Sequence, residues 1–99
     1  MRHVFILNPA AGKGDEIAPL RSKLESECKR LGADYFIYIT QAPGDATEFI
    51  LRECAEGGMF YGEKCRFYAC GGDGTLNEVV AGGVGFPNVA VTHFSGGSG

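Results

Sequence analysis

Tryptophan is absent from this chain of 99 residues, and histidine occurs only twice. The sequence also lacks any run of eighteen apolar residues, which is about the length that a membrane-spanning helix requires. Its first apolar run, residues 4–7, is too short to be the core of a signal peptide. We therefore expect a single small domain that works in the cytoplasm.

Paired metal-ligating cysteines and clusters of basic residues are also missing. The chain has four cysteines that form no CxxC pair, and its two histidines lie near opposite ends, which argues against a zinc site. We interpret these cysteines as reduced thiols of the core: Cys28, Cys54, Cys65 and Cys70. A net charge of -3 without a cluster of lysines and arginines argues against nucleic acid as a partner.

Glycine, by contrast, is abundant. The chain has sixteen glycines, where an average chain of this length carries about seven. Most of them follow residue 70, in the segments GGDG, GGVG and SGGSG. Glycine suits positions where the backbone turns tightly or approaches a ligand closely, so these segments are candidates for a binding site.

The apolar spacing predicts strands that alternate with helices. In residues 15–31, apolar side chains recur every three or four positions and Gly32 follows as a stop signal, which predicts a helix. Two more helices are predicted, one capped by Asp45 and one over 75–81, and strands are predicted at 4–7, 35–39, 67–70 and 89–92. This alternation predicts an α/β fold of three layers: an open, mostly parallel sheet with helices on both faces.

Glycine and small polar residues follow every predicted strand. The four segments read NPAAGKG, TQAPGD, GGDGT and SGGSG. Because the carboxyl ends of parallel strands meet at one edge of a sheet, these segments predict a ligand site there. The alternative is an α/β domain whose glycines merely make turns.

The segment GGDGT follows a strand and opens a helix, where backbone N–H groups and the helix dipole favour phosphate. A carboxylate beside phosphate is repelled unless a cation or a proton intervenes, so we interpret Asp73 as a group that orients Mg²⁺ or accepts a proton from a hydroxyl. The alternative is that Asp73 caps the helix.

Other polar residues near these loops admit two interpretations each. Lys13 can reach phosphate or be solvated, and Thr40 can bind a base or ribose or cap the next turn. Asn77 and Glu78 belong either to the site or to a solvated helix face.

Taken together, NPAAGKG at 8–14, GDAT at 44–47 and GGDGTLNEVV at 71–80 resemble the N-terminal half of the diacylglycerol kinase catalytic family, which is similar to sphingosine and ceramide kinases. The GGDGT segment alone is shared with NAD kinases and, as GGDGS, with phosphofructokinases. The NPxxG and LNEVV segments narrow the resemblance to lipid kinases.

The resemblance implies a Rossmann-like, ATP-dependent lipid kinase that uses Mg²⁺ and takes part in lipid metabolism. Our prediction of Asp73 as the catalytic residue rests on the argument about a carboxylate beside phosphate, not on this resemblance. The resemblance also implies these nucleotide-binding residues: Asn8, Pro9, Ala10, Ala11, Gly12, Thr40, Gly71, Gly72, Asp73, Gly74, Thr75, Leu76, Asn77, Glu78 and Ser98. Ser98 follows from aligning 97–99 with the family's G-[TS]-x segment, although Ser95 stands where proline is usual and two further residues, His93 and Phe94, lengthen the preceding strand.

By the same resemblance, residues 1–99 are the N-terminal ATP-binding part, and a second, largely β domain faces the lipid. We therefore expect these residues to bind nucleotide without lipid kinase activity of their own. We also expect an exposed apolar face that favours a homodimer, and transient contact of the intact protein with a membrane surface. The alternatives are an enzyme like NAD kinase and a nucleotide-binding module without catalysis.

Overall fold

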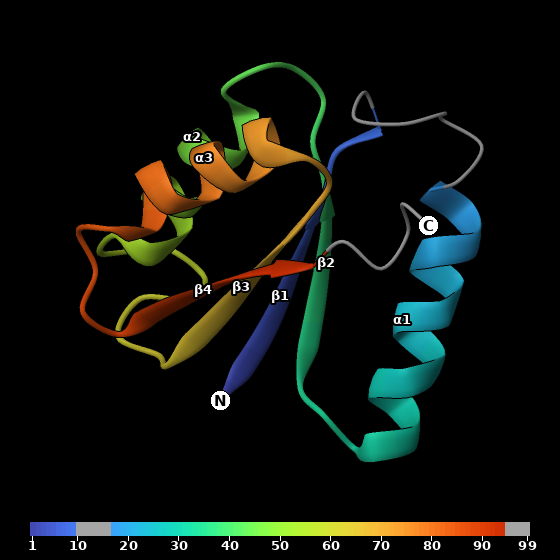
Figure 1. The fold of residues 1–99 in the computed structure, drawn as a ribbon. Helices are drawn as coiled ribbons and strands as arrows, with labels where there is room; N and C mark the ends of the chain where they lie inside the picture. The colour runs from blue at the N-terminus through green and yellow to red at the C-terminus, as the bar shows by residue number, and fades with distance from the viewer. Residues whose placement is uncertain (10–16, 95–99) are drawn as a thin grey trace.

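The computed structural model describes residues 1–9 and 17–94, in which strands and helices alternate. The elements are β1 (Arg2–Leu7), α1 (Ile17–Leu31), β2 (Tyr35–Ile39), α2 (Asp45–Cys54), β3 (Cys65–Cys70), α3 (Asp73–Gly83) and β4 (Val89–Phe94). The four strands form one sheet in the order β2-β1-β3-β4, and every neighbouring pair is parallel (Figure 1). The structure thus confirms the predicted α/β class and parallel sheet.

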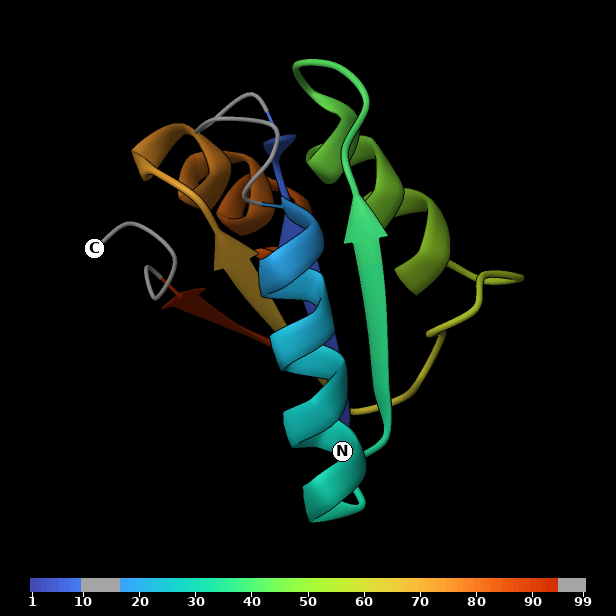
Figure 2. The same ribbon diagram turned by 90° about the vertical axis from the view of Figure 1, so that its right-hand side faces the viewer.

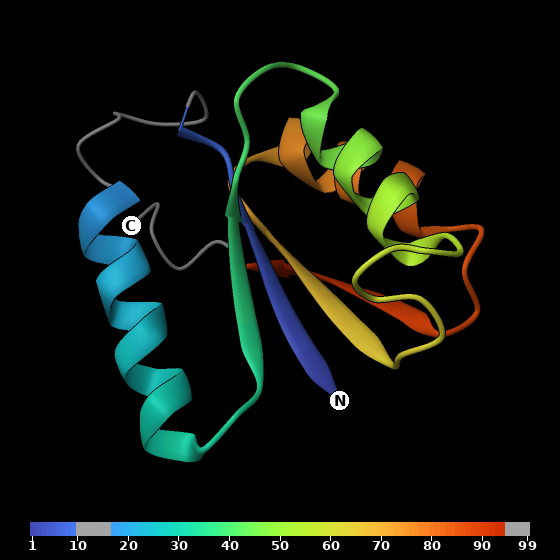
Figure 3. The ribbon, with the colours of Figure 1, turned by 180° about the vertical axis from the view of Figure 1, so that it is seen from behind.

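Helices cover both faces of the sheet, as predicted (Figure 3). On one face α1 packs over β1 and β2, and the core there includes Phe5, Leu7, Leu24, Cys28 and Cys70. On the other face α2 and α3 pack side by side over a larger core that includes Val4, Ile6, Phe49, Ile50, Phe60, Phe67 and Val79. The alternation of β1 side chains between the two cores is the period-two pattern of a strand that is buried on both faces.

Strand pairing extends three strands beyond their predicted ends. The central ladder begins at the pair Arg2 and Cys65, so β1 and β3 each start two residues earlier than predicted. At the other end Cys70 pairs with Phe94, which carries β4 two residues further. Only β2 keeps its predicted limits. These extra residues are held by partners that are distant in sequence.

Glycine marks the start of two helices, and the prediction that Asp45 caps α2 is wrong. The N-cap of α2 is Gly44, at φ 84°, which has no side chain that could cap the helix. The N-cap of α3 is Gly72, so this helix begins at Asp73, two residues before the predicted start at residue 75. The predicted first helix is confirmed from Ile17 onward, and its residues 15–16 lie outside the described residues.

Glycines in the GGVG segment serve helix packing, which the sequence did not predict. A Cβ atom on Gly82 would lie 2.9 Å from Cβ of Ile50 and 3.1 Å from the carbonyl oxygen of Thr47. A Cβ atom on Gly83 would lie 3.0 Å from Cγ1 of Val89. These two glycines let α3 approach α2 and β4 closely.

All four cysteines are buried and free, as the interpretation of core thiols requires. Burial raises the pKa of the Cys70 thiol to about 12 and that of Cys54 to about 11. Among the described helices, none combines the length and the apolar character needed to cross a bilayer.

Candidate functional site

The four strands end level with one another at one edge of the sheet. Leu7 pairs with Ile39 on one side and with Cys70 on the other, and Cys70 pairs with Phe94. The segments that follow the strands therefore start from the same edge, as predicted. Two of these segments, 10–16 and 95–99, lie outside the described residues, and with them the predicted site residues Ala10, Ala11, Gly12 and Ser98 and the candidate Lys13.

The helices that follow the two central strands lie on opposite faces of the sheet. β1 connects to α1 on one face, while the neighbouring β3 connects to α3 on the other (Figures 2 and 3). In open α/β sheets, ligands bind in the crevice that such a reversal creates at the carboxyl ends of the strands. The ends of β1 and β3 are thus the expected centre of a site.

A hydrogen bond joins the two chain segments at this centre. Nδ2 of Asn8, directly after β1, donates to Oγ1 of Thr75 in the first turn of α3, at 3.3 Å. Thr75 is buried, with 3% of its surface exposed. Because its oxygen accepts from Asn8, the Thr75 hydroxyl proton remains available for a second hydrogen bond. The predicted site residues Asn8 and Thr75 are therefore brought together.

The N-terminus of α3 lies beside this bond and has no side-chain cap. The backbone N–H of Leu76 donates to the carbonyl of Gly72 at 3.2 Å, which is the first helical bond, so the N–H groups of residues 73–75 have no acceptor within the helix. A Cβ atom on Gly72 or Gly74 would meet no atom of the described residues within 4 Å. This helix end thus combines N–H donors, the positive end of the dipole and open space, which suits an anion.

Asp73 is the first residue of α3, and its side chain is exposed. Within the described residues no hydrogen bond or ion pair engages its carboxylate, and the alternative that Asp73 caps α3 is wrong. Mg²⁺ in nucleotide sites is commonly held by one or two carboxylates together with phosphates and waters. A single exposed carboxylate beside an anion-binding helix end fits that pattern.

Among the described residues, Asp73 is not part of a larger cluster of metal-ligating side chains. In residues 1–9 and 17–94, no group of three His, Cys, Asp or Glu side chains is placed to hold a metal ion. The described segments that directly follow the strands, 8–9, 40–44 and 71–72, also contain no lysine or arginine. In these three described segments, backbone N–H groups rather than basic side chains are therefore the donors that a phosphate would meet.

Thr40 lies at the end of β2 and is buried. Its backbone N–H donates to the carbonyl of Leu7 at 2.9 Å, and its hydroxyl approaches the same oxygen at 3.4 Å. The hydroxyl is thus directed at β1 in this structure, neither capping the next turn nor standing free. Thr40 joins the ends of β1 and β2, next to Asn8.

Residues 76–78, which follow GGDGT in α3, lie in three different environments. Leu76 is partly buried and packs against the core, whereas Asn77 is exposed on a solvated face. Glu78 is half-buried and contacts α2: its Oε1 accepts from the backbone N–H of Ala46 at 3.3 Å. The interpretation of a solvated face is therefore wrong for Glu78, whereas the exposure of Asn77 agrees with either interpretation.

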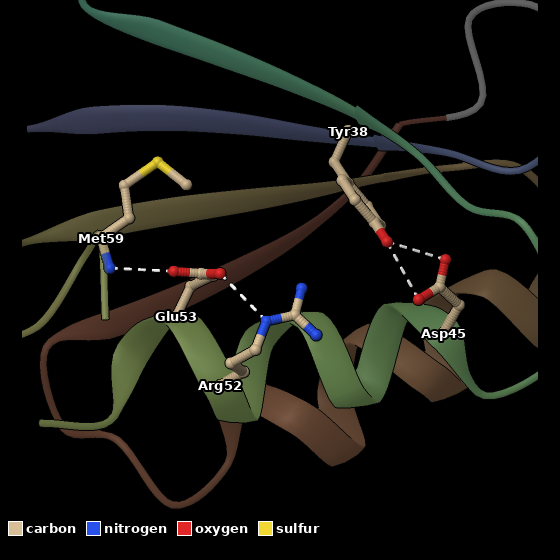
Figure 4. A network of polar contacts seen from close by, with 5 residues as sticks. All are labelled: Tyr38, Asp45, Arg52, Glu53 and Met59. Atoms are coloured by element: carbon tan, nitrogen blue, oxygen red, sulfur yellow. Dashed lines mark hydrogen bonds and ion pairs between the residues drawn. The ribbon is translucent and has the colours of Figure 1, made fainter. Parts of the chain in front are cut away.

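A further polar contact, which the sequence did not predict, joins Tyr38 of β2 to Asp45 of α2 (Figure 4). The hydroxyl of Tyr38 donates to both oxygens of Asp45, at 2.8 and 3.0 Å, and the backbone N–H of Gln41 donates to Oδ2 of Asp45 at 2.9 Å. Burial, followed by the hydrogen bond to Asp45, raises the pKa of Tyr38. The signal in the sequence was the GDAT segment, which we noted only for its resemblance to a family motif.

The loop after β3 is tied to β4. Nε2 of His93 lies 2.8 Å from the carbonyl oxygen of Gly71, at the level where β3 and β4 end. His93 is one of the residues by which β4 exceeds its predicted length, so this extension fixes the start of the GGDGT segment.

Comparison with known families agrees with the geometry of this edge. A family model described as the diacylglycerol kinase catalytic domain matches residues 2–99. No curated protein matches the chain. The matched range includes all three segments that carried the resemblance, NPAAGKG, GDAT and GGDGTLNEVV.

Proposed function

The chain belongs to the diacylglycerol kinase catalytic domain family, and on this basis we propose that it forms the ATP-binding part of a lipid kinase. The intact enzyme transfers the γ-phosphoryl group of ATP to the hydroxyl of a lipid such as diacylglycerol. The observation that carries the proposal is the uncapped N-terminus of α3, which lies at the reversal point of the sheet beside the Asn8 and Thr75 contact.

Phosphoryl transfer depends on positioning and charge neutralisation more than on covalent chemistry. The N–H groups of residues 73–75, which have no acceptor within α3, supply hydrogen bonds to phosphate oxygens, and Asn8 holds Thr75 so that its hydroxyl can add another. The remaining nucleotide contacts are assigned to Pro9, Thr40, Gly71, residues 10–12 and Ser98.

Asp73 is the proposed catalytic residue. Its exposed carboxylate is free to ligate Mg²⁺ or to accept the proton of an attacking hydroxyl. Mg²⁺, when bound, neutralises charge on the transferred phosphoryl group. We propose that residues 1–99 bind nucleotide and that phosphorylation of a lipid requires the intact protein.

The lipid acceptor implies where the intact enzyme works. Diacylglycerol and similar lipids reside in membranes, so we propose that the protein is cytoplasmic and meets its substrate by transient contact with a membrane surface.

Titration with ATP tests the proposal. We expect ATP to bind more tightly with Mg²⁺ than without it, and Asp73→Asn to remove most of this difference. An exposed carboxylate in the loop after α2, changed by Glu56→Gln, is the matched control and should leave the Mg²⁺ effect intact. Binding that is indifferent to Mg²⁺ in the unmodified protein would contradict the role of Asp73.

A second assay separates the alternatives. The intact protein is given labelled ATP with diacylglycerol or with NAD, and the product is followed. A phosphorylated lipid supports the proposal. Phosphorylated NAD would show that the protein is instead an enzyme similar to NAD kinase. ATP binding without either product identifies a non-catalytic module.

A further inference from the structure

Helix α2 begins without a cap of its own. Its N-cap residue, Gly44, has no side chain, and Asp45 turns its carboxylate toward Tyr38 and Gln41. The first N–H groups of a helix need acceptors from outside the helix. An acceptor for the N–H of Ala46, which is 1% exposed, must therefore come from elsewhere in the fold.

Glu78 on α3 supplies that acceptor. Its Oε1 accepts from the N–H of Ala46 at 3.3 Å, and its backbone carbonyl accepts from the hydroxyl of Thr47 at 2.7 Å. A carboxylate near a helix N-terminus also interacts favourably with the helix dipole. One residue of α3 thus binds the first turn of α2 at two points.

Three contacts continue this connection to the edge of the sheet. Asp45, next to Ala46, binds Gln41 and Tyr38 and so fixes the loop 40–44. Thr40 at the start of that loop binds the carbonyl of Leu7. The first turn of α2 therefore links α3, which carries the proposed phosphate site, to the loop that follows β2.

We propose that Glu78 is a positioning residue that holds the loop 40–44 in place relative to the N-terminus of α3, and that it acts without contacting nucleotide. This inference rests on the proposed ATP site. It gives Glu78 a role in which the oxygen acceptor matters and the negative charge is secondary. A ligand of Mg²⁺ or a group that accepts a proton from substrate would instead require the charge.

Two substitutions at Glu78 distinguish these roles. Glu78→Gln keeps an oxygen that can accept from Ala46, whereas Glu78→Ala removes it. We expect Glu78→Ala to weaken binding of ATP with Mg²⁺ about fivefold, which is the equivalent of one lost capping hydrogen bond, and Glu78→Gln to weaken it much less. Equal losses in the two variants would overturn the proposal.

Thr47→Val tests the second contact from the α2 side. It removes the hydroxyl that donates to Glu78 while keeping the shape of the side chain. We expect Thr47→Val to weaken ATP binding, as Glu78→Ala does. Hydrogen exchange of the Ala46 amide should be faster in both variants than in the unmodified protein. Unchanged exchange at Ala46 in Glu78→Ala would contradict the capping contact.

Affinities are compared well below each variant's melting temperature, so that loss of folded protein does not imitate loss of binding. Failure of the unmodified protein to bind ATP would refute the proposed function itself. Normal ATP binding with equal losses in Glu78→Gln and Glu78→Ala would refute only the positioning role.

Discussion

At the scale of single residues, a substitution at Gly74 should have opposite effects on protein stability and on phosphate binding. It is the second residue of α3, and a Cβ atom there would meet no described atom within 4 Å. Alanine is the better helix former, so we expect Gly74→Ala to raise the free energy of unfolding by about 0.5–1 kcal/mol. ATP affinity should fall, because the methyl group occupies space where phosphate approaches the backbone.

Gly85→Ala is the control for this change. A Cβ atom on Gly85 also has open space, but the residue lies after α3, away from the N-terminal turn. It should leave ATP affinity unchanged. Retained ATP affinity in Gly74→Ala would show that phosphate does not approach the backbone at this residue.

Cys70 makes stability depend on pH in the alkaline range. Burial raises the pKa of its thiol from 9.0 to about 12. As the pH rises, the unfolded chain loses this proton before the folded protein does. The contribution of Cys70 to the free energy of unfolding is therefore fully present below pH 9.0 and is lost as the pH rises toward 12. Each such group contributes a slope of at most about 1.4 kcal/mol per pH unit.

Denaturant unfolding between pH 8 and 10, under reducing conditions, measures this slope. Cys70→Ala should have a lower free energy of unfolding at pH 8 than the unmodified protein. Between pH 8 and 10 this free energy should fall less steeply in Cys70→Ala. Part of the fall should remain, because the pKa of Cys54 is also raised. Parallel curves for the two proteins would show that Cys70 does not carry the effect.

Which site residues could be predicted depended on how local their contacts are. Asp73 and the glycines around it were recognisable because a strand, a glycine loop and a helix start are adjacent in sequence. The roles of Glu78 and Asp45 were not, because each carboxylate faces a partner outside its own helix: Ala46 for the first, Tyr38 for the second.

At the scale of elements, Tyr38 connects β2 to α2 through its hydroxyl. Its ring also stacks on Phe49 with 3.9 Å between centroids, and phenylalanine would preserve this stacking. We expect Tyr38→Phe to lower the free energy of unfolding by about 1.5 kcal/mol, as is typical of a hydrogen bond to a charged group.

Tyr61→Phe is the control because that side chain is exposed, and it should change stability by less than about 0.5 kcal/mol. A double-mutant cycle of Tyr38→Phe with Asp45→Asn should give a positive coupling energy. Equal stabilities of Tyr38→Phe and Tyr61→Phe would contradict the role of this bond.

Element type could be predicted throughout the described chain, whereas several limits could not. Apolar periodicity identified each helix and strand because the period is a local property. The extra residues of β1 and β3 depend on the pairing of Arg2 with Cys65, which no local pattern contains. The N-caps Gly44 and Gly72 were missed because glycine carries no side chain that signals a cap.

At the scale of the whole molecule, the larger core depends on an aromatic residue from the loop between α2 and β3. Phe60 is fully buried, and its ring makes edge contacts with those of Phe36, Phe49 and Phe67. Removing such a ring costs about 3–5 kcal/mol, a large part of the 5–15 kcal/mol that stabilises a typical domain. We expect Phe60→Ala to lower the free energy of unfolding by about 3–5 kcal/mol.

Val84→Ala is the control, since Val84 is 80% exposed and should change stability by less than about 0.5 kcal/mol. Circular dichroism during urea titration measures both variants. A Phe60→Ala protein as stable as Val84→Ala would mean that this ring does not anchor the core.

The fold class followed from the alternation of strands and helices, but the strand order did not. Alternation requires parallel strands with crossovers, yet it leaves open which strand lies in the centre. β1 and β3 are neighbours because α1 covers one face of the sheet and α2 covers the other. The face that each helix covers depends on packing between segments that are distant in sequence.

This order has a consequence for how the chain folds during synthesis. β1 gains β2 as its first partner, but its other edge stays open until Cys65–Cys70 has been made, because β2, α1 and α2 all lie between the two central strands in sequence. Closing so long a loop delays the central ladder and slows folding relative to a helical protein of this size. A nascent chain that stops short of β3 therefore presents an unpaired strand edge, which chaperones or other strands can bind.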